Sequence, residues 1–399
     1  MMKKLWIATE LFYPDETSTS FILTKIANKL CDKYETKVLC ATALAAEQNY
    51  FVLDGRVQVE RLISGENSKA NLKKRALVSI WFSFKIFFKL LFNCKSTDKV
   101  FIVTNPVFLI FMVAVAKKIK KFDFVILVHD VFPENGIPAK IFPSKDAFTY
   151  KLIKYFFDWS YASSDQLIVL GRDMKAVMQG KINKWKSKTQ ITIIENWGDT
   201  ENIFPKNKES VLQSDAPLLH KVAFQYAGNI GRVQGLMGLL ENVMQVNNNK
   251  IVFQFVGDGA VKNEMMAFVT KQKMKNIFFA DSYQRQEQNE ILNSADVAII
   301  TLADGMFGLG VPSKLYNLLA AGKPILYFGD SNSEIALLIK EYDIGYHFEP
   351  YNSGEIIQFF NQIGEEFIEN LTIKSKNARN LASANFSENL IINKFLIAI

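Results

Sequence analysis

Short apolar runs alternate with helical segments along almost the whole chain of 399 residues, and this alternation constrains the fold most strongly. The runs are rich in β-branched and aromatic residues, and the stretches between them are too long for tight hairpins. Strands separated by helices form parallel sheets that helices cover on both faces. The pattern predicts strands at 5–9, 36–41, 57–62, 99–104, 124–129, 166–170, 191–194, 222–226, 251–256, 277–280, 297–302 and 325–328.

Length and one polar stretch divide this pattern into two domains. A chain of 399 residues exceeds one ordinary domain, and its 49% apolar content can fill two cores. Residues 199–221 are polar, contain two prolines and lack periodicity, which is typical of a linker. We therefore predict an α/β fold of two Rossmann-like doubly wound domains facing across a cleft. They comprise residues 1–200 and 222–380, joined by a linker at 201–221, and a C-terminal helix at 381–399 packs back on the first domain.

Charge is distributed unevenly between the halves. Residues 1–200 carry 30 Lys and Arg against 19 Asp and Glu, a net charge of +11, whereas residues 201–399 carry 17 against 21, a net charge of −4. Only the first half is therefore expected to face an anionic surface.

The three cysteines form no metal-type cluster and indicate free thiols in a reducing compartment. The basic start is followed by too few apolar residues for a signal peptide, so we expect a cytoplasmic protein.

The apolar segment 77–92 indicates which anionic surface this is. At 1.5 Å per residue it spans about 24 Å, short of the ~30 Å hydrocarbon core, so it is expected to lie in a membrane interface rather than cross it. Four polar residues, which we expect on one side of the helix, interrupt it: Ser79, Ser83, Lys85 and Lys89. The predicted membrane-facing residues are Lys73, Lys74, Arg75, Trp81, Phe84 and Phe88.

The alternative is that 77–92 and a second apolar run, 107–116, are core helices with lysines at their rims. Nucleic acid is not an expected partner, because the aromatic residues cluster on one apolar helix and are not interleaved with basic residues on a polar face.

The segment 301–328 has the clearest functional pattern. A strand is followed by a Gly-rich loop, by Pro312 at an expected first helical position, and by Ser313 and Lys314 at the start of a helix. Unpaired N–H groups, a hydroxyl and an ammonium would then meet at one place, which suits a phosphate. The alternative is an ordinary β-loop-α unit whose helix is capped by Ser313.

Two more Gly turns follow strands of the second half. The first, A-G-N-I-G-R-V-Q-G, is not the G-x-G-x-x-G of a dinucleotide site, but Gly228 and Gly231 allow backbone N–H groups to approach a pyrophosphate and Arg232 can neutralise it. The second contains Gly257 and Gly259. All three turns follow parallel strands, whose carboxyl ends form the ligand-binding edge of such sheets. Plain turns with a solvated arginine are the alternative.

The first half offers polar residues at the corresponding edge. His129, one of three histidines, follows a buried strand beside Asp130 and Glu134. The loop after the first strand offers the Glu16 carboxylate and the hydroxyls of Thr17, Ser18 and Thr19. A structural histidine and simple capping of the next helix by Thr19 or Ser20 are the alternatives. No Cys/His spacing or Asp-x-Asp pair indicates a metal.

Over the whole chain these motifs resemble the retaining glycosyltransferases of family 4, which have the GT-B fold, and in particular the branch that builds bacterial O-antigen and capsule repeat units. The motifs are the Tyr-Pro loop near residue 13, H-D-V-F-P-E at 129–134, E-N-W-G-D at 195–199, A-G-N-I-G at 227–231, V-G-D-G at 256–259, V-P-S-K-L-Y at 311–316 and A-A-G-K-P at 320–324. The resemblance implies that the second domain binds a UDP-sugar, N-acetylated or deoxy, and that the first binds a polyprenyl-diphosphate-linked saccharide. The acceptor-binding residues would then be those of the loop after the first strand, Glu16, Thr17, Ser18 and Thr19.

The chain departs from the family pattern at four positions. Where many members have an Arg and a Lys that cradle the diphosphate, this chain has Asn229 and Gln234. Where they have two glutamates eight residues apart, the second binding ribose, it has Leu309 and Asn317. We count Asn229, Gln234 and Asn317 among the donor-binding residues, with Arg232 and Lys314 supplying the missing cations.

The predicted activity is that of a retaining hexosyltransferase that needs no metal and no cofactor other than its UDP-sugar donor. The protein would stabilise the departing diphosphate, His129 would position sugar or acceptor, and Asp130 or Glu134 would orient it. The alternatives are a UDP-sugar 2-epimerase of the same architecture and a non-catalytic, glycosyltransferase-like scaffold. The predicted enzyme is peripheral on the inner face of the cytoplasmic membrane.

Overall fold

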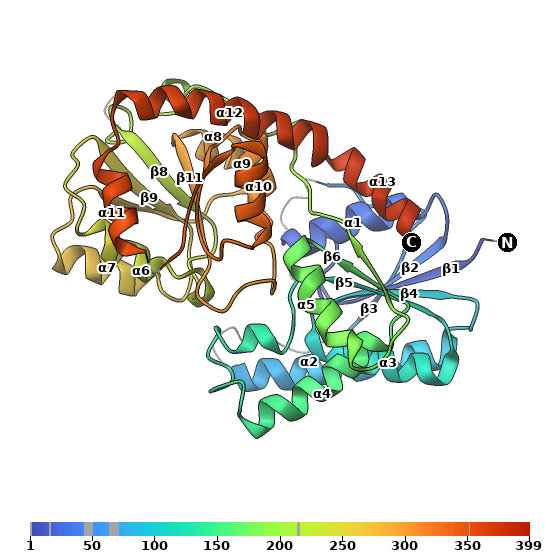
Figure 1. The fold of residues 1–399 in the computed structure, drawn as a ribbon. Coiled ribbons are helices and arrows are strands. Elements are labelled where there is room, and N and C mark those ends of the chain that lie inside the picture. Colours follow the sequence, from blue (N-terminus) through green and yellow to red (C-terminus); the bar gives the residue numbers. More distant parts are fainter. Residues whose placement is uncertain (1, 16, 44–50, 64–71, 214–215, 351) are drawn as a thin grey trace. The chain divides into compact units, whose positions relative to one another are not determined.

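The computed structural model describes residues 2–15, 17–43, 51–63, 72–213, 216–350 and 352–399, without the side chains of 72–75. The chain forms two compact units, which are shown in Figure 1. Unit 1 comprises Met1–Ile137, Phe142–Glu195 and Ile392–Ile399, and unit 2 comprises Pro138–Ile141 and Asn196–Ile391. The main chain thus leaves unit 1 after Glu195 and returns to it after Ile391.

Unit 1 is built on a parallel sheet, which has seven strands among the described residues, in the order β3-β2-β1-β4-β5-β6-β7. Its central strands are continuous apolar runs, because helices cover both faces of the sheet. The strands are β1 Lys4–Ala8, β2 Glu35–Ala41, β3 Gln58–Leu62, β4 Lys99–Val103, β5 Asp123–Val128, β6 Gln166–Val169 and β7 Gln190–Ile193.

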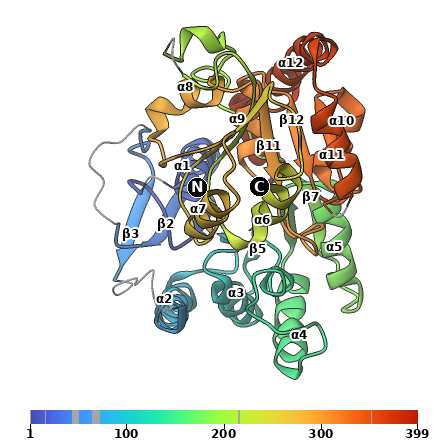
Figure 2. The same cartoon turned by 90° about the vertical axis from the view of Figure 1, so that its left-hand side faces the viewer.

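Four helices of unit 1 pack side by side in the order α2-α3-α4-α5. Figures 1 and 2 show α2, α3 and α4 in a row along one face of the sheet, with α1 on the other. The short helix η1, Glu134–Gly136, follows β5. The helices are α1 Ser18–Leu30, α2 Leu72–Asn93, α3 Val107–Lys120, α4 Phe148–Ala162 and α5 Arg172–Asn183.

The C-terminal residues complete unit 1. Helix α13, Glu388–Ala398, buries Phe395, and the Lys394 ammonium pairs with Glu195 at 2.7 Å. The last carbonyl, of Ile399, accepts hydrogen bonds from Tyr34 and, at 2.7 Å, from Lys99. Residues about 200 positions beyond Glu195 thus pack in unit 1, next to the starts of β2 and β4.

Unit 2 has a second parallel sheet, six-stranded among the described residues, in the order β10-β9-β8-β11-β12-β13. Stacked and edge-to-face rings of Phe224, Phe253 and Phe360 form part of its core. The strands are β8 Val222–Ala227, β9 Ile251–Val256, β10 Ile277–Ala280, β11 Val297–Thr301, β12 Ile325–Phe328 and β13 Gly345–Phe348. The helices are α6 Leu236–Val243, α7 Lys262–Lys271, α8 Gln288–Asn293, α9 Lys314–Ala320, α10 Glu334–Tyr342, α11 Ser353–Asn361 and α12 Glu365–Asn385, with η2 Lys208–Ser210, η3 Arg232–Gln234 and η4 Arg285–Glu287.

The predicted fold class, two Rossmann-like doubly wound parallel sheets, is confirmed. Every expected strand is present with its ends within one residue of the prediction. Strand β13 was not predicted, because its sequence G-Y-H-F is short and only partly apolar. The C-terminal helix expected at 381–399 is interrupted at Phe386 and Ser387, between α12 and α13.

Candidate functional site

The predicted donor residues of unit 2 lie at the carboxyl end of β8. In the strand order, β8 lies between β9 and β11, so the loops after β8 and β9 diverge from the loop after β11. In open α/β sheets ligands bind at this point, where the strand order reverses. The loop after β11 leads into α9, so all three predicted Gly turns follow neighbouring strands.

The two Gly turns after β8 and β9 contact each other through their backbones. A Cβ on Gly257 would lie 2.0 Å from the carbonyl oxygen of Gly228, and one on Gly259 would lie 2.3 Å from that of Ile230. Gly228, Gly257 and Gly259 also have φ between +136° and +157°, where side chains are strained. Glycine is therefore required here for the close approach of two turns.

Most glycine N–H groups that we expected to meet a pyrophosphate are already bonded within unit 2. Gly228 donates to the carbonyl of Val256 at 2.9 Å, and Gly257 donates to that of Ala280 at 3.1 Å. Gly259 donates to the side chain of Asp258. Of the four glycines Gly228, Gly231, Gly257 and Gly259, Gly231 is the one whose N–H has no acceptor among the described residues, so it remains able to bind an anion.

Lys314 provides an enclosed cation at the same place. Its side chain extends from the start of α9 to β8, where the ammonium lies 3.5 Å from the centre of the Tyr226 ring. A Cβ on Gly228 would be 3.1 Å from this nitrogen. The ammonium is buried and has no hydrogen-bond acceptor among the described residues. Burial lowers the pKa of Lys314 to about 7.

The other expected donor residues surround Gly231. A Cβ there would meet the Gln234 Oε1 at 2.6 Å and the Asn229 Nδ2 at 2.9 Å, so both amides border this turn. The Gln234 carbonyl accepts from the hydroxyl of Thr301, which attaches η3 to the end of β11. Arg232 lies exposed on η3.

The start of α9 differs from the prediction. The helix begins at Lys314, not at Pro312 or Ser313, and the exposed Ser313 makes no side-chain capping bond. The Asn317 amide accepts from the N–H of Asp199 at 2.9 Å and donates to Gln288 at 3.3 Å. Its hydrogen bonds therefore attach α9 to the segment after Glu195, and a ligand would have to share them.

In unit 1 the residues after β5 are held by the neighbouring strand. The Thr104 hydroxyl, at the end of β4, accepts from the backbone N–H of His129 at 3.1 Å and of Asp130 at 3.2 Å. The His129 Nε2 has no hydrogen-bond partner among the described residues, and burial lowers the pKa of this imidazole to about 4. His129 is therefore neutral at pH 7. Asp130 as a residue is exposed, but partial enclosure of its carboxyl still raises the pKa of this group.

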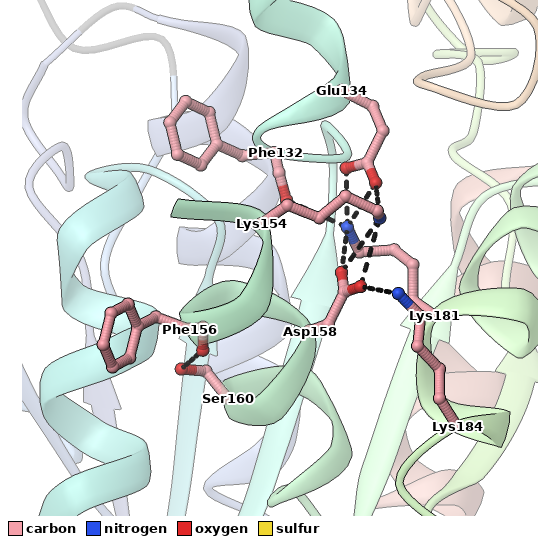
Figure 3. Close-up of polar contacts among 8 residues, drawn as sticks. All are labelled: Phe132, Glu134, Lys154, Phe156, Asp158, Ser160, Lys181 and Lys184. Carbon is pink, nitrogen blue, oxygen red and sulfur yellow. Dashed lines mark hydrogen bonds and ion pairs between the residues drawn. The ribbon is translucent and has the colours of Figure 1, made fainter. Parts of the chain in front are cut away.

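Glu134 belongs to a buried charge network rather than to an open site. Figure 3 shows the ammonium groups of Lys154 and Lys181 between its carboxylate and that of Asp158. Asp158 bridges the same two lysines, at 3.1 and 2.7 Å, and also pairs with Lys184 at 2.7 Å. The carboxylate that we expected to orient a substrate thus attaches the loop after β5 to α4 and α5.

Burial and charge act against each other in this network. Burial raises the pKa of Asp158, but Lys181 and Lys184 outweigh it and hold that pKa below its ordinary value. Burial lowers the pKa of Lys181, against the attraction of Glu134 and Asp158. For Lys154 the two carboxylates prevail over burial and raise the pKa. Opposite charges therefore compensate one another where water is excluded.

The expected acceptor-binding loop begins helix α1. The Thr17 hydroxyl caps the helix by accepting from the N–H of Ser20 at 3.1 Å, so the cap lies before the expected Thr19 or Ser20. Ser18 is exposed and Thr19 half-buried. Glu16 lies outside the described residues.

The predicted membrane-facing residues lie on α2. Trp81 and Phe88 are exposed, and Phe84 is half-buried with its ring against Phe108. The side chains of Lys73, Lys74 and Arg75 lie outside the description. By length and composition, residues 76–93 are the one described helical stretch that could cross a membrane.

The polar residues of α2 do not form one outer stripe. Ser83 is buried, and its hydroxyl donates to the Ser79 carbonyl. Lys85 and Lys89 instead lie at the edge beside β3, where Lys89 pairs with Glu60. At about 100° per residue the four positions do fall within one half of the helix, but Ser83 is buried there, so this half is not a solvated stripe.

Sequence reasoning missed several residues that shape these sites. Tyr226 and Thr104 lie at the ends of predicted strands, and this position could have identified them. Lys154, Asp158 and Lys181 are spaced 20 to 47 residues from Glu134, so no local pattern connects them with it.

Comparison with known proteins identifies the family. The model of the family described as "Glycosyl transferases group 1" matches residues 215–380. The "Probable glycosyltransferase WbjE" of Pseudomonas aeruginosa is 32% identical over 400 residues, which cover 99% of this chain and 97% of that protein. The chain belongs to the group 1 glycosyltransferases. WcaI of Escherichia coli K12, named for colanic acid biosynthesis, is 22% identical over 172 residues, 42% of each chain.

Solved structures agree on the fold. Anabaena HepE in complex with UDP superposes with a TM-score of 0.70 at 15% identity, over 100% of this chain and 99% of that one. The two doubly wound units are therefore those of the GT-B fold.

Proposed function

We propose that this glycosyltransferase moves a sugar, N-acetylated or deoxy, from a UDP-sugar to a polyprenyl-diphosphate-linked saccharide, with retention of configuration and without a metal. The observation that carries the donor assignment is the enclosed, unpartnered ammonium of Lys314 beside the turn at Gly228. A buried cation without an acceptor is costly, and a diphosphate would compensate it.

The chemistry of the donor supports this assignment. HepE has been solved with UDP and with UDP-glucose, so a protein of this fold binds such a donor. In unit 2, the Lys314 ammonium and the Gly231 N–H are free to bind phosphate oxygens, and the exposed Arg232 can add a second cation. These groups would stabilise the charge that develops on the diphosphate as it leaves.

The residues of unit 1 suit a positioning role for the acceptor. His129 would bind sugar or acceptor as a neutral imidazole, and the exposed Asp130 would orient it. Glu134 would act indirectly, by holding their loop through Lys154 and Lys181. In a retaining transfer without a covalent nucleophile, the acceptor hydroxyl attacks the anomeric carbon of the donor sugar. It does so on the same face of the sugar from which the diphosphate departs.

The acceptor and the location of the enzyme follow from the same proposal. WcaI is named as a putative glycosyl transferase of colanic acid biosynthesis, and by analogy this chain would act in the assembly of O-antigen or capsule. A lipid-linked acceptor would place the enzyme at the inner face of the cytoplasmic membrane, as a peripheral protein on an anionic surface. The basic unit 1 fits that surface.

Nucleotide binding tests the donor assignment first. Thermal unfolding would be measured with UDP, GDP, ADP and UMP in the presence of a chelator. UDP at 100 times its Kd should stabilise the native state by about 2.7 kcal/mol. The double variant Arg232→Ala/Lys314→Met should lose this effect. If the double variant bound UDP as tightly as the wild type, neither Arg232 nor Lys314 would belong to the donor site.

Product analysis then separates the rival activities. Transfer to a lipid-linked acceptor should release UDP and give a product with the donor's anomeric configuration by NMR. Conversion of the donor without an acceptor would indicate an epimerase. Binding of UDP without its release from any donor would indicate a scaffold.

A further inference from the structure

The outer surface of helices α2, α3 and α4 carries an unusual share of exposed apolar side chains. These helices lie in a row over one face of the unit 1 sheet (Figure 2). Trp81 is 62% exposed and Phe148 78% exposed. We call the following residues the aromatic face: Leu77, Trp81, Phe88 and Phe92 of α2, Ile119 of α3, and Phe148, Leu152, Tyr155 and Phe156 of α4.

Ring contacts join the three helices into one surface. The Phe84 ring of α2 lies 6.1 Å from that of Phe108, which is 5.9 Å from Phe111 of the same helix α3. Phe111 in turn lies 5.8 Å from Phe156 of α4. Because the rings support one another across the helix boundaries, the face is held in place before any partner binds.

The packing of α2 shows why this surface lies along a bilayer rather than across it. Phe82, Ile86 and Leu90 are buried on one side of the helix, whereas Trp81 and Phe88 face outward. Spanning would require the buried side to leave the protein. Helix α4 is also too short, since its 15 residues extend about 22 Å.

The charges around the face favour an anionic partner. Residues 72–162 contain 15 Lys and Arg against 6 Asp and Glu, a net charge of +9. Lys118 and Lys121, at the end of α3, are exposed and form no ion pair with any residue that the structure describes. Aromatic rings with lysines at the edges match the headgroup layer, where rings enter the interface and ammonium groups meet anionic lipids.

We propose that the aromatic face, with α4 as well as α2 in contact, docks unit 1 onto a bilayer that contains anionic phospholipid. This deepens the proposed function, since a lipid-linked acceptor resides in such a bilayer. Sequence periodicity had placed only α2 at the membrane. The Phe148, Leu152 and Tyr155 side chains of α4 extend that contact.

Sedimentation with vesicles tests the proposal independently of donor and acceptor. The intact protein would be mixed with vesicles of phosphatidylcholine, alone or with phosphatidylglycerol. We expect binding to the mixed vesicles that weakens with salt. The variants Trp81→Ser/Phe88→Ser on α2 and Phe148→Ser/Leu152→Ser on α4 should each reduce vesicle affinity by about tenfold or more.

A matched control lies in unit 2. Ile368 and Ile373 of α12 are also exposed, so Ile368→Ser/Ile373→Ser removes comparable apolar surface and should leave vesicle binding unchanged. UDP affinity should be the same in all three variants, which separates a failure of docking from a failure of the donor site.

No vesicle binding by the intact protein, or full binding by the α4 variant, would overturn the proposal. A concentration-dependent dimer that the α4 variant abolishes, without vesicle binding, would assign the face to a second copy of the chain.

Discussion

Lys314 shows how one residue can prepare a site for an anion. Its ammonium lies over the Tyr226 ring and beside the Gly228 turn, enclosed and without an acceptor among the residues described. The ring face offers some compensation for the charge, but burial still lowers the pKa to about 7. A fraction of the free protein is therefore uncharged at this position near neutral pH, and an anion would favour the charged form.

We expect UDP binding to take up a proton at Lys314. Below pH 7 the ammonium is already charged, whereas above pH 7 binding must recruit the proton. The UDP affinity of the wild type should then fall by about tenfold per pH unit above pH 7, relative to Lys314→Met. At pH 6 this substitution should weaken binding by about 30-fold, or about 2 kcal/mol. Calorimetric titrations from pH 6 to 9 measure both.

The exposed Lys271→Met, on α7, is the matched control and should leave the profile unchanged. Parallel pH profiles for wild type and Lys314→Met would show that Lys314 does not titrate on binding.

At the scale of elements, the charge network sets the position of the loop after β5. Its members come from η1, α4 and α5, and Asp158 and Lys181 are almost fully buried. Removing one member of a buried pair leaves an uncompensated charge, which costs more than an exposed pair contributes. The network therefore fixes Glu134, and with it the course of the chain from His129.

Glu134→Gln should destabilise unit 1 by about 3 kcal/mol, because Lys154 and Lys181 would share Asp158 alone. The exposed pair Lys151–Asp146 is the control, and Asp146→Asn should cost less than about 1 kcal/mol. Urea unfolding measures both. If Glu134 touched substrate instead, Glu134→Gln would reduce kcat without changing the urea midpoint.

The same elements show what sequence patterns could predict. Strands such as β5 were predictable because a continuous apolar run between helices indicates a buried parallel strand. The start of α9 was misplaced by one residue, because Pro312 and Ser313 both favour a helix start. The network and the Lys314–Tyr226 contact join residues far apart in sequence, so only the folded chain reveals them. The donor residues near Gly228 were predicted as a group, but the internal use of their N–H groups was not.

At the scale of the whole molecule, unit 1 is completed by the last eight residues, Ile392–Ile399. Phe395 is buried, and Ile399 accepts hydrogen bonds from Tyr34 and Lys99. Unit 1 therefore cannot complete its core until the chain beyond unit 2 is present. The stability of the first sheet depends on a segment that follows the second.

Phe395→Ala should destabilise unit 1 by about 3 kcal/mol, because it removes a buried ring. Its neighbour Ile397 is 83% exposed, and Ile397→Ala should change stability by less than about 0.5 kcal/mol. Hydrogen exchange with mass spectrometry would locate the effect, with faster exchange in β1 and β4 and unchanged exchange in β8 and β9. Equal acceleration in both sheets would mean that the units unfold together.

Helix α4 has a further consequence, since it carries aromatic side chains outward and holds Glu134 from its flank. One layer of helix thus separates the proposed docking surface from the loop that bears His129, and such a layer is about 10 Å thick. If the diphosphate of an acceptor stays among the lipid headgroups, its saccharide must extend away from the bilayer by roughly the thickness of this helix layer before its hydroxyl reaches the loop. The enzyme would then select acceptors by length, and prefer a lipid that already carries sugar residues to one that carries none.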